Sequence, residues 1–569
     1  MRQKIKQMKK RKRNKFNIIF FVIAISVIAF FSYKLYKRYS FTKERANLEE
    51  YIGAKGDEVA IFLNDTLQNH FDTSIKHKAI KRNDTVYLPL SYVKSFLNNR
   101  FYYAKDINKI LYCVPDEVRV AGDTDIHQIG NAPFVIFLDE PYLLIDYVKD
   151  YTNMRYDMYL DDESKRVYIY NDWDREEIAY LKGRESARVQ GGNKSPVVTD
   201  LRRGEEVKII DTMTKWIKVK TADGYIGYIR KSKISKITER VPVSDYIEMV
   251  RKGNKLDKKP CIGFHQVLSI YSSSKLPELL KNTQGMNVIA PTWYAIRNDE
   301  GEIRSIANDA YALYCHAKKL AVWATVNNFD IADVNEKTLF SSTLTRRKMI
   351  DKILREVSVN NLDGINLDIE HISADAGEDY TEFVRELSIE LTKVGCTLSI
   401  DTYVPYGFNK HYDLKEYNDF CDYVIIMCYD EHYAGSKEAG SVSSLSYVKD
   451  GIELSLTSVD KDKLIIGLPY YTRIWTTTTA GKVTSIVGSS QSIESAALNQ
   501  GLKFTFDSVT SQNYGYKLTQ DGDTVECWME DDLSLAYKML EIKKADVAGT
   551  AAWKLTQERE NFFKVINMN

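Results

Sequence analysis

Asp363-Gly364-Ile365-Asn366-Leu367-Asp368-Ile369-Glu370 is the stretch that decides the fold of the largest part of this chain. Side chains of a β-strand alternate between its two faces. Asn366, Asp368 and Glu370 therefore share one face, and the three aliphatic residues share the other. Acids on an inward face are costly to bury unless they have a role, and their repulsion raises one pKa. The pattern predicts a carboxylate pair in which Glu370 is a general acid beside an ionised Asp368.

Apolar runs with the character of strands surround this motif between residues 259 and 569. They are Cys261–His265, Met286–Ala290, Leu320–Asn327, Gly364–Glu370, Thr397–Tyr403, Tyr423–Cys428, Leu464–Leu468 and Gly549–Trp553. Helical stretches lie between them, among them Arg346–Ser358 and Tyr380–Val394. Strands and helices that alternate in this way predict a (β/α)8 TIM barrel over 255–569, with the polar strand face in the lumen. Active groups of such barrels sit at the C-terminal ends of the strands.

The acidic motif resembles the DGxDxDxE signature of glycoside hydrolase family 18, and the similarity extends over 259–569. Further matching stretches are Pro291–Tyr294, Trp323–Phe329, Met427–Asp430 (the family's MxYD element), Gly467–Arg473, Trp528–Asp531 and Gly549–Trp553. The pattern is most similar to the bacterial spore and cell-wall branch. The resemblance implies hydrolysis of β-1,4 linkages in an N-acetylglucosamine-containing glycan, peptidoglycan before chitin, with neither a cofactor nor a metal.

The resemblance also implies catalytic roles by position. Glu370 would be the general acid/base, Asp368 would orient the substrate's acetamido group, and Tyr429 would hydrogen-bond the carbonyl oxygen of that group. The acetamido group itself would attack the anomeric carbon, with net retention, which is an exception to the usual scheme of two carboxylates.

Seven further residues are expected to bind substrate or to line its cleft: Asn366, Trp553, Asp430, Arg473, Trp293, Asn327 and Tyr403. Trp553 would form an apolar floor under the sugar, because pyranose C–H faces pack well on an indole. Trp293 fits a core position equally well. Asn366 departs from the family pattern, since many chitinases carry an acid there, and we expect altered pKa coupling rather than lost activity.

Other functions remain open. A chitinase would show the same motif. A catalytically inactive relative could bind glycan as a lectin-like module, although the presence of Glu370 together with Asp368 and Tyr429 favours an enzyme. A metal at the Asp/Glu pair is disfavoured, because no histidine lies at strand spacing and such sites need more ligands.

Residues 1–45 form a separate segment with 14 basic groups and one acid, a net charge of +13 that leaves −12 on the remainder. Between Lys15 and Lys34 lie eighteen uncharged residues, a helix of about 27 Å against a hydrocarbon core of about 30 Å. The basic excess predicts a single-pass anchor through 16–33, with a cytoplasmic N-terminus and the catalytic domain outside. A cleaved signal peptide is the rival interpretation, but no small-x-small site follows. A nucleic-acid-binding arm is disfavoured by the apolar run behind the basic residues.

Residues 46–178 contain an internal repeat, in which 87–114 is echoed by 142–170. Tyr87, Tyr92, Val93, Lys94 and Asp106 recur, 55 residues later, as Tyr142, Tyr147, Val148, Lys149 and Asp161. Each copy predicts a short strand, a short helix and a hairpin, hence an α+β repeat domain. It resembles the copper amine oxidase N-terminal-like domain of bacterial surface proteins over roughly 50–175. That similarity implies a wall-binding or spacer role and no copper, since its histidines are not clustered.

Residues 183–237 predict a small β-barrel of short strands and turns. The segment is similar to a bacterial SH3-type domain through Arg188, Gly204, Trp216, Val219, Gly224, Gly227 and Tyr228. That similarity implies binding of a cell-wall peptide, whereas Trp216 and Tyr228 could equally fill the core. The chain's seven cysteines include no CxxC pair, which excludes a disulfide framework and a zinc site.

Overall fold

The computed structural model describes residues 1–569 except 69–77, 128–129, 161–163 and 330–333, so Asp161 of the predicted repeat lies outside the described residues. The chain divides into two compact units. One comprises residues 1–101 and 121–247, and the other comprises 102–120 and 248–569.

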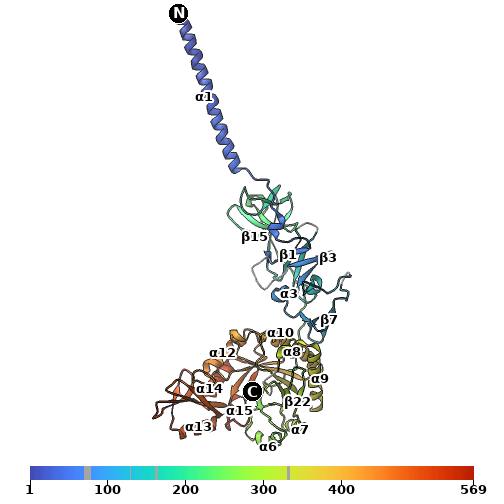
Figure 1. Ribbon diagram of the computed structural model, residues 1–569, viewed down its shortest axis with the longest axis vertical. Coiled ribbons are helices and arrows are strands. Elements are labelled where there is room, and N and C mark those ends of the chain that lie inside the picture. Colours follow the sequence, from blue (N-terminus) through green and yellow to red (C-terminus); the bar gives the residue numbers. More distant parts are fainter. Residues whose placement is uncertain (69–77, 128–129, 161–163, 330–333) are drawn as a thin grey trace. The chain divides into compact units, whose positions relative to one another are not determined.

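The second unit contains the predicted barrel (Figure 1). Eight strands pair in parallel, and the last of them also pairs with the first, so the sheet closes. The strands are β19 (Cys261–His265), β20 (Val288–Pro291), β23 (Ala321–Asn327), β24 (Gly364–Asp368), β25 (Thr397–Tyr403), β26 (Tyr423–Met427), β27 (Leu464–Pro469) and β33 (Gly549–Trp553). The predicted barrel is confirmed, and the predicted strand bounds differ from these by two residues at most.

Helices cover the outside of the barrel. They are α5 (Ile270–Ser273), α6 (Leu276–Leu279), α7 (Asp309–Ala317), α8 (Glu336–Ser341), α9 (Thr343–Val359), α10 (Gly377–Lys393), α11 (Leu414–Phe420), α12 (Leu445–Ser455), α14 (Asp532–Ala545) and α15 (Phe562–Ile566). Ile365 and Leu367 of β24 share one buried cluster with Met349 of α9 and Phe383 of α10. The aliphatic face of the acidic motif therefore packs against helices, which leaves the polar face for the lumen.

Aromatic side chains fill the lumen below the acidic motif. Trp323 is fully buried and stacks on Tyr423, with the ring centroids 5.3 Å apart. Gly364 is paired with Trp323 on the neighbouring strand, and a Cβ at Gly364 would lie 2.5 Å from the indole. Only glycine leaves room for the indole at this level. The polar residues of β24 begin two positions further along the strand, above this buried aromatic layer.

A smaller sheet is inserted between β27 and β33. It consists of β28 (Tyr471–Thr477), β29 (Val483–Ser489), β30 (Lys503–Asp507), β31 (Gln512–Leu518) and β32 (Thr524–Trp528), in the order β29-β28-β32-β31-β30, with α13 (Ser490–Asn499). Two further short strands, β21 (Tyr294–Ile296) and β22 (Ile303–Ser305), follow β20 and pair with each other.

A hairpin of the first repeat copy belongs to the barrel unit. It consists of β5 (Tyr102–Ala104) and β6 (Lys109–Cys113), and β7 (Val118–Gly122) extends its sheet. The Tyr102 hydroxyl donates to Asp379 Oδ1 of α10 at 2.6 Å. Cys113 packs against Ile389 of the same helix. These buried contacts make the hairpin a structural part of the barrel's outer surface.

The first unit contains two sheets. The repeat sheet consists of β1 (Glu58–Leu63), β2 (Thr66–Leu67), β3 (Ala79–Arg82), β4 (Thr85–Pro89), β8 (Phe134–Phe137), β9 (Glu140–Leu144), β10 (Arg155–Tyr159) and β11 (Arg166–Tyr170), with helices α2 (Leu48–Ile52), α3 (Leu90–Phe96) and α4 (Ile145–Asp150). The SH3-like sheet consists of β12 (Glu176–Tyr180), β13 (Glu185–Arg188), β14 (Val197–Leu201), β15 (Glu206–Thr212), β16 (Trp216–Thr221), β17 (Ile226–Arg230) and β18 (Thr238–Arg240). Trp216 and Tyr228 are half-buried and are not members of the SH3-like core cluster.

The chain begins with the long helix α1 (Arg2–Tyr39). Its most apolar 18-residue window has a mean hydropathy of 2.4 and is not buried, so length and composition fit a membrane span or a signal sequence. The segment behind α1 runs along β14: the amide of Val197 donates to the carbonyl of Glu44 at 2.7 Å. The Phe41 ring lies 4.6 Å from the guanidinium of Arg230.

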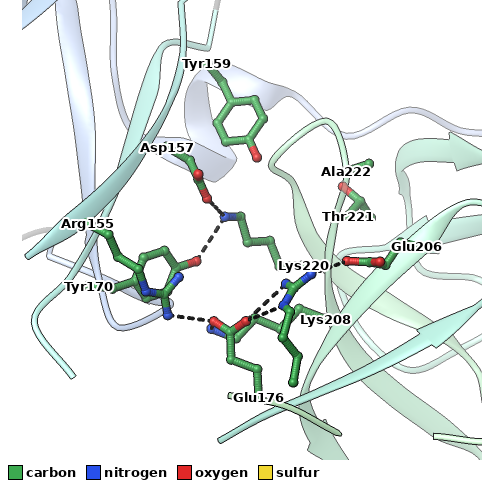
Figure 2. Close-up of a pocket in the computed structure, with 11 residues that line it drawn as sticks. Arg155, Asp157, Tyr159, Tyr170, Glu176, Glu206, Lys208, Lys220, Thr221 and Ala222 are labelled. Atoms are coloured by element: carbon green, nitrogen blue, oxygen red, sulfur yellow. Dashed lines mark hydrogen bonds and ion pairs between the residues drawn. The ribbon is translucent and has the colours of Figure 1, made fainter. Parts of the chain in front are cut away.

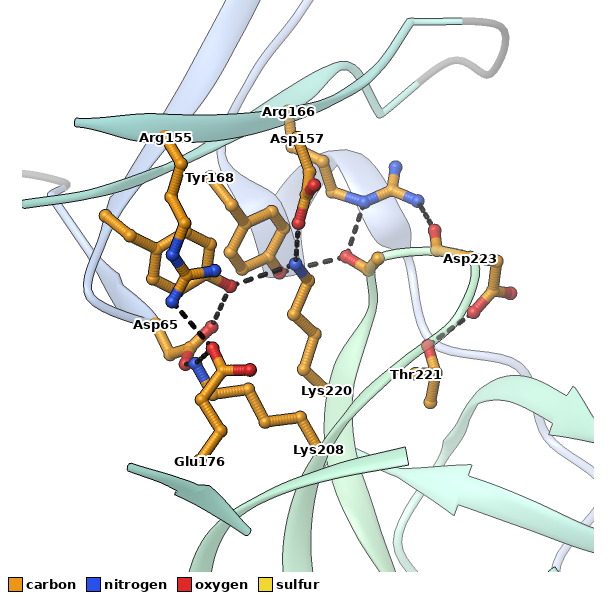
Figure 3. A network of polar contacts seen from close by, with 12 residues as sticks. Asp65, Arg155, Asp157, Arg166, Tyr168, Glu176, Lys208, Lys220, Thr221 and Asp223 are labelled. Carbon is orange, nitrogen blue, oxygen red and sulfur yellow. Dashed lines mark hydrogen bonds and ion pairs between the residues drawn. The ribbon is translucent and has the colours of Figure 1, made fainter. Parts of the chain in front are cut away.

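A network of charges joins the two sheets of the first unit around a pocket of about 150 Å³ (Figures 2 and 3). Glu176, 5% exposed, accepts hydrogen bonds from Arg155 at 2.7 Å and from Arg240 at 3.0 Å. The ammonium of Lys208 lies 2.9 Å from Glu176 and 2.7 Å from Asp65. Burial alone would raise the pKa of Glu176, but the hydrogen bonds from Lys208 and Arg155 outweigh it and lower this pKa to about 2.

We expect Glu176→Gln to lower the free energy of unfolding of the first unit by about 3 kcal/mol at pH 7, because it leaves buried cations without their carboxylate. A carboxyl whose native pKa is depressed stabilises the fold above its unfolded pKa, and this stabilisation is lost as the pH falls towards the native value. The difference between wild type and variant should therefore shrink between about pH 4.5 and pH 2. Denaturant unfolding monitored over this range measures it.

Glu239→Gln is the matched control, since Glu239 pairs with Arg175 while more than half of each side chain is exposed. Equal losses of stability in the two variants would contradict the argument.

Candidate active site

The C-terminal ends of neighbouring barrel strands bring the predicted catalytic residues to one mouth. Asp368 ends β24, and Glu370 follows it by two residues. Tyr403 ends β25, Tyr429 follows β26, and Trp553 ends β33. Because parallel strands of a barrel all end on the same side, residues 368 to 553 meet there despite their separation in sequence.

Glu370 is held from two sides. Its backbone is clamped by Asn328, whose amide donates to the Glu370 carbonyl at 2.7 Å and accepts from the Glu370 amide at 3.0 Å. Its carboxylate accepts a hydrogen bond from the Tyr403 hydroxyl at 2.8 Å. The side chain keeps 26% of its surface exposed, enough for its carboxyl to reach a ligand in the mouth.

Burial raises the pKa of Glu370 above its ordinary value. The hydrogen bond from Tyr403 and the nearby His371 oppose this shift, whereas Asp430 adds to it. His371 is 86% exposed, with its ring nitrogen 3.9 Å from the carboxylate, so its field is largely screened. Glu370 therefore retains its proton to a higher pH than a free glutamate does.

Asp368 lies deeper, with 4% of its surface exposed. Burial raises its pKa well above the ordinary value, and the neighbouring Asp401 and Glu370 raise it further. Its Oδ1 atom is buried without a hydrogen-bond partner among the residues that the structure describes. Such an atom can accept a hydrogen bond from a ligand, such as the N–H of an acetamido group.

Asn366 is fully buried and does not reach the mouth. Its amide nitrogen donates to Asp401 Oδ1 at 2.9 Å and to Ser399 Oγ at 3.1 Å, both on β25. The side chain thus acts within the lumen, one layer below Asp368.

The other predicted residues differ in how far they are buried and in their hydrogen-bond partners. Asp430 is exposed and accepts a hydrogen bond from the Tyr471 hydroxyl at 2.7 Å, while Arg473 donates to Ser485 at 3.1 Å. Tyr429 and Trp553 are half-buried at the rim. Asn327 is 5% exposed and accepts from the amide of Phe329.

Trp293 requires a correction. It is 1% exposed and packs edge-on against Tyr311, 4.9 Å between ring centroids, inside the apolar layer between strands and helices. Neither face of its indole is open to a sugar. The core position that the sequence also allowed is the one it occupies.

Sequence reasoning missed Asp401, Asn328 and Tyr471. Asp401 could have been found, because strand alternation places it on the same inward face as Ser399 and Tyr403. Asn328 and Tyr471 act from positions just beyond their barrel strands, where alternation gives no guide.

The arrangement suits proton transfer to a ligand. A half-exposed carboxyl with a raised pKa stands above a buried carboxyl, and Tyr429 beside them has its pKa raised by burial and by Asp368, so its phenol remains a donor. An acid that keeps its proton to a higher pH than a free glutamate is suited to general acid catalysis.

Comparison with known proteins agrees with this geometry. Residues 308–558 match the profile of glycosyl hydrolases family 18, and residues 187–235 match that of the bacterial SH3 domain. The chain therefore contains a family 18 domain and a bacterial SH3 domain, as the two motif sets indicate.

Two curated relatives come from Bacillus subtilis (strain 168). The "Uncharacterized glycosylase YvbX" is 24% identical over 294 residues, which are 49% of this chain and 84% of that protein. The "Cortical fragment-lytic enzyme" is 23% identical over 245 residues, 42% of this chain and 56% of that protein, so the match spans little more than half of its length. Among solved structures, a chitinase from Chromobacterium violaceum ATCC 12472 aligns with 18% identity and a TM-score of 0.48, over 54% of this chain and 98% of that one.

We expect Tyr403→Phe to raise the pKa of Glu370 further, because the hydrogen bond from Tyr403 favours the charged carboxylate. Infrared titration of the carboxyl band, assigned by subtracting the spectrum of Glu370→Gln, measures this shift.

Tyr406→Phe is the matched control, since the Tyr406 hydroxyl donates to Asp450 and not to Glu370. A Glu370 band that titrates at the same pH in Tyr403→Phe as in wild type would show that the hydrogen bond has no influence on the acid.

Proposed function

We propose that this protein is a membrane-anchored glycosidase that hydrolyses β-1,4 linkages of an N-acetylglucosamine-containing glycan, by substrate-assisted retaining catalysis. The observation that carries the proposal is the geometry of the barrel mouth, where the partly exposed Glu370 accepts a hydrogen bond from Tyr403 at 2.8 Å and follows the buried Asp368 by two residues. The family 18 match over 308–558 supports the same reaction class.

In this mechanism Glu370 donates its proton to the glycosidic oxygen as the C1–O bond breaks. The acetamido oxygen of the same sugar attacks C1 and gives an oxazolinium ion, while Asp368 accepts the acetamido N–H. Tyr429 donates to the acetamido oxygen. Water then attacks C1 as the C1–O bond of the oxazolinium ring breaks and restores the acetamido group, Glu370 takes a proton from the water, and the configuration at C1 is retained.

The remaining rim residues bind the sugar chain. Trp553 supplies the apolar floor, since its indole is half-exposed at the end of β33. Asp430, Arg473, Asn327 and Tyr403 form polar walls, with Tyr403 also setting the acidity of Glu370.

Peptidoglycan is the substrate we favour over chitin. Support comes from the name of the Bacillus subtilis relative, cortical fragment-lytic enzyme, and from the SH3 domain at 187–235, for which we propose a cell-wall peptide as ligand. The half-buried Trp216 and Tyr228 on adjacent strands β16 and β17 support such contacts. For residues 46–178 we propose a spacer or wall-binding role, following their resemblance to the copper amine oxidase N-terminal-like domain.

Digestion of purified peptidoglycan by the full-length chain in detergent tests the activity. We expect new N-acetylglucosamine reducing ends, identified by mass spectrometry after borohydride reduction, and a β-anomer as the first product in NMR. Glu370→Gln should lower the rate by about 10²- to 10⁴-fold, the usual contribution of a positioned general acid.

Glu278→Gln is the matched control, an exposed carboxylate on the short helix α6 of the same barrel. Chitin oligomers form the second substrate arm. Peptidoglycan and chitin that both remain intact with wild type would refute the hydrolase and favour a glycan-binding module.

For α1 we propose a single membrane span with the N-terminus in the cytoplasm, supported by the nine basic groups of residues 1–15, which precede the apolar window. Protease added to intact protoplasts should digest the residues beyond Tyr39 and spare residues 1–15. Lysed protoplasts, in which both sides are accessible, are the control. Protection of residues 46–569 in intact protoplasts would contradict this orientation.

A further inference from the structure

The acid that neighbours Asp368 lies on a different strand from the one where the sequence motif places it. Position 366, two residues before Asp368 on β24, is an asparagine. The buried acid is instead Asp401 of β25, 4% exposed. The register of β24 and β25 pairs Asn366 with Ser399, so Asp368 and Asp401 occupy the same level of the lumen.

Asn366 and Asp401 are hydrogen-bonded to each other across the two strands. Asn366 Nδ2 donates to Asp401 Oδ1 at 2.9 Å, which fixes that carboxyl. An aspartate at 366 would instead add a further acid to Asp368, Asp401 and Glu370 in a buried lumen. Carboxylates that lie so close together cannot all ionise in a low dielectric. The amide at Asn366 and the acid at Asp401 therefore depend on each other.

A proton is the available counter-charge for this pair. Burial and Glu370 raise the pKa of Asp401 well above its ordinary value, and the hydrogen bond from Asn366 only partly opposes them. No Lys or Arg acts on either carboxyl within the part of the chain that the structure describes. Nor does either belong to a three-ligand metal arrangement among those residues.

We propose that Asp401 is a positioning residue of the hydrolase, which shares one proton with Asp368 and so takes the part that an acid at position 366 would otherwise play. The proposal rests on the proposed function of the site. While Asp401 holds the proton, Asp368 is the ionised acceptor for the acetamido N–H. When a ligand leaves, the proton is redistributed within the pair.

Several titratable groups face this pair from the surrounding elements. Glu370 and Asp368 lie on or after β24, Tyr403 and Asp401 on β25, and Tyr429 after β26. The hydroxyl groups of Tyr380 on α10 and of Tyr412 also sense the charge of Asp368. Each of these tyrosines has a pKa raised by burial, so the phenols keep their protons while the carboxyls titrate, and the exposed His371 lies 3.9 Å from Glu370.

An exchange of the two side chains tests the proposal. Asp401→Asn keeps an oxygen that can accept from Asn366 but removes the shared proton, and Asn366→Asp adds a buried acid. We expect each single variant to lower kcat at least about tenfold, the equivalent of one pKa unit, with KM little changed. The double variant N366D/D401N restores one acid and one amide on the two strands, with their positions exchanged, and should recover most of the wild-type kcat.

A double variant that is folded yet as slow as the single variants would overturn the proposal. So would Asp401→Asn with the kcat and the pH–rate profile of wild type. Asp450→Asn, which removes an exposed carboxylate on α12, is the control and should match wild type.

A second measurement does not depend on activity. Carboxyls whose native pKa is raised bind protons that the unfolded chain has lost, so the free energy of unfolding falls as the pH rises above about 4. Asp401→Asn removes one carboxyl of the pair, so this fall should be smaller in the variant than in wild type between pH 5 and 8. Circular dichroism of thermal unfolding measures the two slopes.

Equal slopes in wild type and Asp401→Asn would overturn the shared proton. If wild type cleaves no glycan but the slopes differ as expected, the proposed function fails while the coupled pair stands. If wild type cleaves glycan and the slopes and rates are unchanged, the proposed function stands and the role of Asp401 fails.

Discussion

Burial of acids inside a closed parallel barrel is the constraint on which the rest of this structure depends. Closure fixes which side chains enter the lumen, and it places Asp368 and Asp401 at one level with Glu370 above them. In low dielectric the charged forms are disfavoured, and their pKa values rise. The buried aromatic layer of Trp323 and Tyr423 fills the lumen below these acids.

The outside of the same barrel treats buried acids differently. On α10, Glu386 receives two hydrogen bonds from Arg346, and Glu382 receives one from Arg385 at 2.9 Å. Arg385 also binds Glu416 of α11 at 2.9 Å. These acids have guanidinium partners, which offset part of the cost of burying a carboxylate. No Lys or Arg acts in this way on Asp368 or Asp401 among the described residues.

The first unit accommodates a buried acid in a third way, by surrounding it with several cations. Its repeat and SH3-like sheets meet around Glu176, whose partners come from both sheets, Arg155 from one and Lys208 and Arg240 from the other. A carboxylate shared in this way has a depressed pKa and strengthens the joint at neutral pH. The segment that follows α1 adds backbone hydrogen bonds to β14 of the same unit.

The sequence by itself determined the barrel and its strand bounds to within two residues. It also identified Asp368, Glu370, Tyr429 and Trp553 as candidate site residues. It also identified the SH3-like segment and the apolar helix. These depend on patterns within a few neighbouring residues, such as the alternation along β24.

Only the tertiary structure decided that Asp401 is the neighbour of Asp368 and that Asn366 donates a hydrogen bond to Asp401. It also decided that Trp293 lies in the core. It also placed the hairpin of Tyr102 against α10 rather than with the rest of its repeat. The physical reason is that alternation along one strand fixes a side chain's face, whereas the register between strands and the packing of distant segments are set by closure of the whole sheet.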